Sequence, residues 1–178
     1  MYFTHISMLS VRRFCLNKLT ILAFSLFITS HIDAQIDIKS KVDAQTYTEY
    51  SKVIDLFEKN INQNDVVTLF IPINYSLDRL QQDKYDKIFV QNDVNEINAF
   101  IDNYSLNQNV DLDLLKQNLI NSNSVFNVTS KSSKNYFFSI NDNNYMISDN
   151  KTFEANVFKI VVINSNLSIY FIKSVIKY

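Results

Sequence analysis

The sequence predicts an α+β fold, in which several helices precede a run of short strands. Up to Asn121 most apolar residues recur at helical intervals, and after Ser122 they occupy short segments separated by polar turns. Helices followed by consecutive strands are typical of α+β domains. Because 47% of the residues are hydrophobic and 13% are aromatic, the chain can build a packed core. No repeat or linker interrupts residues 35–178, so we expect a single domain there.

The first helix is expected over residues 47–60, where apolar residues recur every three or four positions. Thr46 and Glu49 have the spacing of a capping box at its start. Asp55 and Lys59 stand four residues apart and can pair on the exposed face of this helix.

A buried strand and four further helices are expected next. The nearly continuous apolar run over 66–73 predicts the strand, and Pro72 ends it because proline lacks a backbone N–H. Asn74 is expected to cap a short helix, and a second short helix is expected over 85–90. The caps of the two helices after these are expected at Asn92 or Asp93 and at Asp111.

Five strands should follow. Their expected ranges are 125–129, 135–140, 145–148, 152–163 and 167–178. Both faces of the last strand are mostly apolar, so it should lie centrally in its sheet. The chain contains no glycine, so left-handed turn positions must use Asn or Asp. The segments 141–144 and 164–166 are the expected turns of this kind.

Residues 1–34 have the three parts of a secretory signal peptide. An apolar run over 19–29 is shorter than the about 20 residues of a membrane-spanning helix, and small and polar residues follow it. We expect cleavage between Ala34 and Gln35. The basic residues that precede the run are Arg12, Arg13 and Lys18.

Removal of this segment would change the chemistry of the chain. Both histidines and the cysteine lie in it, and the whole chain has no tryptophan or glycine. The segment carries three basic residues and one acidic residue, so the net charge would change from −1 to −3. This balance provides no electrostatic attraction to nucleic acid or to anionic lipid. We therefore expect neither partner, and no membrane span after processing.

Two segments far apart in the chain resemble conserved sequences of one family. Residues 68–77, TLFIPINYSL, resemble the first box of fasciclin domains, T-L-F-A-P-T-N-E-A-F. Residues 166–176, NLSIYFIKSVI, resemble the second box, N-G-x-I-H-V-I-D-x-V-L. Tyr104 and Ser105 stand where the family has a Tyr-His pair. The departures from the family sequence include Leu167 for Gly, Tyr170 for His, Lys173 for Asp and Ser105 for His.

The resemblance implies a fold and a role. The implied fold is fasciclin-like: a β-sandwich of short strands with several helices packed against one side. The implied role is that of an extracellular adhesion or interaction module with a protein or glycan partner. The residues singled out as a possible interaction site are Tyr104, Ser105 and Asn74.

Acid–base and metal chemistry have little support in the sequence. Carboxylates can form a catalytic pair in space, but none here has a local signature. The carboxylates considered are Asp111, Asp113, Asp142 and Asp149. Oxygen ligands at 141–144 could hold calcium, although a polar hairpin turn is the preferred interpretation. We expect no catalytic residue, no metal and no cofactor.

These observations favour an exported, non-enzymatic interaction module that is secreted, periplasmic or displayed on the cell surface. One alternative is an exported accessory protein that binds a small ligand or a polysaccharide. It would need a deep apolar pocket, whereas adhesion would use a flat face lined by Tyr and Asn. Another alternative is a hydrolase, which would need two convergent, buried carboxylates.

Overall fold

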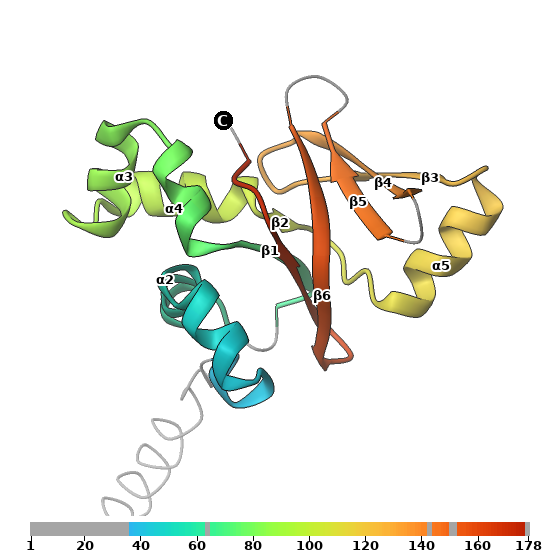
Figure 1. The fold of residues 1–178 in the computed structure, drawn as a ribbon, viewed down its shortest axis with the longest axis horizontal. Helices are drawn as coiled ribbons and strands as arrows, with labels where there is room; N and C mark the ends of the chain where they lie inside the picture. Colours follow the sequence, from blue (N-terminus) through green and yellow to red (C-terminus); the bar gives the residue numbers. More distant parts are fainter. Residues whose placement is uncertain (1–35, 63–64, 142–143, 150–152, 177–178) are drawn as a thin grey trace, which may run out of the picture. The chain divides into compact units, whose positions relative to one another are not determined.

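A seven-stranded β-sheet and a group of helices make up the described part of the chain in this computed structural model (Figure 1). The proposed signal peptide, with its cleavage point between Ala34 and Gln35, lies outside that part. Within the described residues, no helix has the length and apolar character needed to cross a membrane. The structure describes residues 36–62, 65–141, 144–149 and 153–176.

Two helices begin at the capping residues that were predicted for them. Asp93 accepts hydrogen bonds from the backbone N–H groups of the next turn, and Asp111 does the same at its own helix. The two 3-10 helices and four α-helices described are η1 (Lys39–Lys41), α2 (Ala44–Asn60), η2 (Asn74–Arg79), α3 (Gln82–Phe89), α4 (Val94–Asn103) and α5 (Leu112–Asn121).

The predicted capping box of α2 is wrong. Asp43 caps this helix, and its carboxylate accepts from both the backbone N–H and the hydroxyl of Thr46, each at 2.8 Å. A carboxylate is a stronger acceptor than a hydroxyl, so the helix starts at Ala44. Asp55 also departs from its predicted pairing, because it accepts a hydrogen bond from the Tyr47 hydroxyl at 3.0 Å.

The strands run in the order β2-β1-β7-β6-β5-β4-β3. β7 is parallel to β1 and antiparallel to β6, and all six of its residues are buried, which confirms the predicted central strand. It ends earlier than expected, because the chain bends at Lys173 and turns Ile176 into the core. The strands are β1 (Val67–Pro72), β2 (Ser105–Leu106), β3 (Val125–Thr129), β4 (Asn135–Asn141), β5 (Asn144–Ser148), β6 (Glu154–Asn164) and β7 (Leu167–Ile172).

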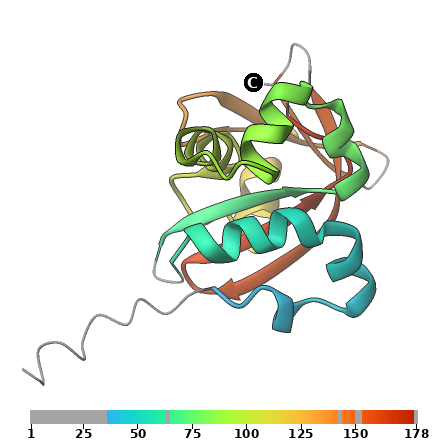
Figure 2. The same ribbon diagram turned by 90° about the vertical axis from the view of Figure 1, so that its left-hand side faces the viewer.

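The sheet closes on itself as a barrel-like sandwich, which confirms the predicted fold class. An antiparallel bridge joins Leu106 of β2 to Ser130, just beyond β3. Inside, the ring of Phe70 lies 6.0 Å from that of Tyr136 and 6.0 Å from that of Tyr170. On the opposite face of the sheet, helix α2 runs along the strands (Figure 2).

The tight turns obtain left-handed backbone without glycine. Positive φ angles among the described residues occur at Asn92, Asn123, Ser124 and Ser133. The predicted turn at 164–166 joins β6 to β7 without such an angle, and a register shift between Val162 and Asn164 precedes it. Serine in two of these positions was not expected, and residues 142–143 of the other predicted turn lie outside the described chain.

Candidate functional site

The Tyr104 and Ser105 side chains are fully buried. The Tyr104 hydroxyl donates to the carbonyl of Ile176 at 3.1 Å and accepts from the N–H of Ile176 at 2.6 Å. The Ser105 hydroxyl donates to the carbonyl of Ile101 at 2.6 Å. The structure therefore gives both residues a packing role and leaves neither at the surface.

Asn74 lies at the junction between η2 and α2. Its side-chain oxygen accepts from the N–H of Lys52 at 3.2 Å, and its Nδ2 donates to the carbonyl of Thr48 at 3.0 Å. These two backbone groups are four residues apart in α2, so one amide matches both the donor and the acceptor. The predicted cap of a following helix is therefore wrong: Asn74 is the first residue of η2 and bonds to a different helix.

A groove opens beside Asn74, and we name it the Tyr75–Phe158 groove. It encloses about 580 Å³ between the start of α2, η2, β6 and the segment after β7. Tyr75 is 60% exposed and Phe158 is 50% exposed, which is unusual for two large rings lining one hollow. The remaining lining residues are Gln45, Thr48, Glu49, Ile73, Asn74 and Lys173.

The ring of Phe158 is supported from within the protein. Tyr50 stacks with it at a centroid distance of 6.5 Å and packs edge-on against Phe171 at 4.9 Å. The ammonium group of Lys173 lies 5.1 Å from the centre of the Phe158 ring. Burial raises the pKa of Tyr50, and its hydroxyl has no hydrogen-bond partner among the described residues. The groove thus presents an aromatic surface held in place by packing.

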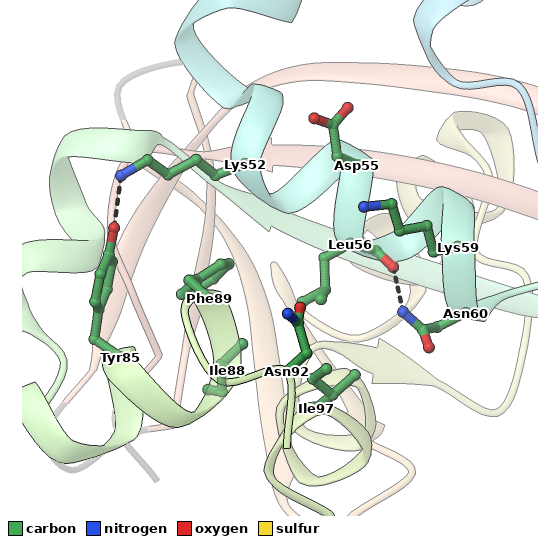
Figure 3. A pocket seen from close by; sticks show the side chains of 10 residues that line it. All are labelled: Lys52, Asp55, Leu56, Lys59, Asn60, Tyr85, Ile88, Phe89, Asn92 and Ile97. Carbon is green, nitrogen blue, oxygen red and sulfur yellow. Dashed lines mark hydrogen bonds between the residues drawn. The ribbon is translucent and has the colours of Figure 1, made fainter. Parts of the chain in front are cut away.

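A second hollow of about 400 Å³ lies between α2 and the α3–α4 pair (Figure 3). Lys52 spans part of its rim and donates to the Tyr85 hydroxyl at 2.7 Å. Its interior is apolar, with Lys59, Asp55 and two asparagines around it. The lining residues are Lys52, Asp55, Leu56, Lys59, Asn60, Tyr85, Ile88, Phe89, Asn92 and Ile97.

Two of the carboxylates considered as catalytic groups have local structural partners. Asp111 caps α5, Asp113 lies in its first turn, and Asp149 accepts from the N–H of Phe153 at 2.9 Å. Asp142 lies outside the described residues. In the described ranges no Asp or Glu is buried, and no group of three or more His, Cys, Asp or Glu is arranged to hold a metal ion.

Two departures from the family sequence have structural explanations. Tyr170, in place of histidine, is buried and donates to the carbonyl of Val110 at 2.8 Å. Lys173, in place of aspartate, is exposed and lies over Phe158. The sequence did not single out Tyr75 or Phe158, because an apolar residue in a helix or strand is normally assigned to the core. Only their exposed fractions distinguish them.

Comparisons with known proteins gave one family match and a structural similarity. The family model described as Fasciclin domain matches residues 43–178. A solved FAS1 domain pair from the insect cell adhesion molecule fasciclin I is 15% identical, with a TM-score of 0.46. That match covers 74% of this chain and 43% of the other, so this chain spans less than half of its length. No curated protein matches the sequence. Because this family model matches most of its length, the chain belongs to the fasciclin domain family.

Proposed function

We propose that this protein is exported and acts at the cell surface or outside the cell as a non-enzymatic adhesion module. Fasciclin domains are adhesion and protein-interaction modules of extracellular or cell-surface proteins. The signal-like residues 1–34 support export, and residues 35–178 would then work as one domain.

The observation that carries this proposal is the exposed aromatic pair in the Tyr75–Phe158 groove. Tyrosine and phenylalanine bury large areas on contact and are frequent anchors of interfaces. Around them Gln45 and Glu49 supply donors and acceptors that can set the orientation of a partner, while the Asn74 amide is held by its bonds to α2. A surface of this kind suits a protein or a glycan, but it is a groove lined by one Tyr and one Asn and not the flat Tyr- and Asn-lined face expected for adhesion.

A capture experiment tests the proposal. The chain is immobilised and exposed to extracellular-matrix proteins, cell-surface proteins and a glycan array, and the affinity of each captured partner is measured. We expect Tyr75→Ala and Phe158→Ala each to weaken binding by about tenfold or more. The matched control is Ile120→Ala on α5, which removes an apolar side chain that is 79% exposed away from the groove.

Two results would contradict the proposal. One is the absence of any partner from the three sets, and the other is equal binding by the groove variants and the control. Hydrolysis of a glycan by the chain would instead support the carboxylate-dependent alternative.

The apolar interior of the second hollow, between α2 and the α3–α4 pair, favours a second candidate function, the binding of a small ligand. Leu56, Ile88 and Ile97 are all less than a tenth exposed, although they line this hollow. An apolar body could lie on them while Lys59 contacts a polar end. Native mass spectrometry of the purified chain checks this candidate, because a bound molecule would add a defined mass that Ile97→Lys should remove.

A further inference from the structure

The second half of β6 is an unusual part of the sheet. β5 pairs with β6 only from Glu154 to Asn156, and β6 then continues beyond the end of β5 (Figure 1). Among the described residues, the segment 157–163 has a ladder partner on one side only, which is β7. One edge of this segment therefore presents backbone N–H and C=O groups that no neighbouring strand pairs.

The side chains of this segment agree with an open edge. None of residues 157–163 is buried, whereas every residue of the adjacent β7 is. Phe158 and Val162 are 50% and 51% exposed. The segment reads VFKIVVI, with a single charged residue, so it lacks most of the charges that protect natural edge strands.

The groups along this edge define what can occupy it. Backbone donors and acceptors at strand spacing are matched by another extended strand. The other ends of the sheet are less open, because the Leu106–Ser130 bridge joins them. The β6 segment of a second copy offers the same groups and the same apolar side chains, and two copies can pair around a two-fold axis.

We propose that two copies of this chain associate by antiparallel pairing of their β6 segments. The ladder with β7 is regular over residues 159–162, between two register shifts, so this stretch is the centre of the contact. Every second residue of a strand directs its backbone N–H and C=O toward the open edge. Two residues that pair across the two-fold axis therefore have residue numbers that differ by an even number. With the axis at Ile160, Lys159 lies opposite Val161 of the other copy and not opposite a second lysine.

Charge also favours this occupant. The ammonium group of Lys159 already pairs with Asp43 of its own chain at 2.6 Å. The net charge is −1 for the whole chain and −3 without residues 1–34, so two copies repel each other only weakly. This association goes beyond the proposed binding role. Phe158 lies in both the groove and the edge segment, but Val162 does not line the groove, so a test at Val162 does not depend on that role.

Sedimentation equilibrium of the full chain, with Val162→Lys as the test variant, checks the proposal. We expect a concentration-dependent dimer whose dissociation constant rises about tenfold or more in the variant, because a lysine at an edge opposes strand pairing. Val90→Lys is the matched control, since Val90 is 64% exposed at the end of α3 and outside β6. This control should leave the dimer unchanged.

Hydrogen exchange on the wild-type chain gives a second readout that needs no substitution. The amides of residues 157–163 should exchange more slowly as the protein concentration rises. A chain that stays monomeric at high concentration would overturn the proposal. So would a dimer that Val162→Lys leaves intact, or one without added protection over 157–163, because either places the contact elsewhere.

Discussion

Buried tyrosine hydroxyls connect parts of this protein that lie far apart in the sequence. Three of these hydroxyls each donate to a distant backbone carbonyl. The carbonyl lies 72 residues from Tyr104, 33 residues from Tyr136 and 60 residues from Tyr170. The described chain holds neither histidine nor cysteine. These phenols therefore supply cross-links that another chain could obtain from imidazole groups or disulfides.

Tyr104→Phe should lower the free energy of unfolding by about 2–3 kcal/mol. The substitution keeps the ring, which stacks on Phe100 at 4.2 Å, but leaves the buried N–H and C=O of Ile176 without the hydroxyl. Urea denaturation monitored by circular dichroism measures the change. A loss below about 0.5 kcal/mol would show that these two bonds contribute little.

Tyr50→Phe is the matched control for that experiment. Tyr50 is also fully buried, but its hydroxyl has no hydrogen-bond partner among the described residues. Because the hydroxyl is desolvated without a bond in return, its removal should leave stability unchanged or raise it by up to about 1 kcal/mol. A clear loss of stability in the same urea series would mean that the Tyr50 hydroxyl has a partner in solution.

Asp43 makes stability depend on pH in the acid range. Its hydrogen bond with Lys159, and then those from Thr46, hold the pKa of Asp43 far below its ordinary value. A depressed folded-state pKa adds stability that is complete above the unfolded pKa of about 3.9 and is lost as pH falls toward the folded pKa. Asp43→Asn should therefore be less stable than wild type at pH 7, and the gap should narrow below about pH 4. Thermal unfolding at pH 7 and pH 3 measures it, and a gap that stays constant would contradict this role.

At the scale of elements, the Asn74 amide joins η2 to α2. Asn74→Ala would remove its bonds to Thr48, Ser51 and Lys52. We expect a loss of about 1–2 kcal/mol in the free energy of unfolding, because the junction is half-buried and water can replace part of the bonding. Urea denaturation measures it. Asn74→Asp keeps the acceptor and loses the donor, so its free energy of unfolding should be at most intermediate between those of wild type and Asn74→Ala. Full stability in both variants would exclude the amide as the link.

The elements themselves could largely be predicted, because their signals are local. Asp93 and Asp111 are followed by apolar residues at helical spacing, and both cap helices. The start of α2 was missed because Asp43 and Thr46 are both suitable caps, and the choice depends on Lys159, which lies 116 residues away. The end of β7 was missed for a similar reason, since the chain leaves the strand at Lys173 and the backbone of Ile176 bonds to Tyr104, 72 residues away.

At the scale of the whole molecule, the sheet is protected unevenly. The bridge at Ser130 closes one side of the sheet. On the other side β6 extends beyond the end of β5 and leaves an unpaired strand edge. The Tyr75–Phe158 groove opens where β6 approaches η2 and α2. Phe158 belongs to both features, whereas Tyr75 lines only the groove and Val162 lies only on the edge. Substitution of Tyr75 and of Val162 can therefore separate binding of a partner from self-association.

Export makes a prediction about the whole chain. The native protein should begin near Gln35 and therefore contain no thiol, because Cys15 would be removed with the signal peptide. Intact-mass spectrometry of material from the native host, with a thiol assay beside it, measures both. Recovery of a chain that still carries Cys15 would contradict processing at this position and return a thiol and two histidines to the working protein.

The sequence by itself determined the class of fold, the order of helices and strands, the central place of the last strand and two of the helix caps. Those features follow from periodicity and from contacts between near neighbours. Only the tertiary structure decided that Tyr104 and Ser105 are internal, that Asn74 bonds to α2, and that Tyr75 and Phe158 face outward. The physical reason is that exposure of an apolar side chain depends on which distant segment covers it, and no local pattern records that.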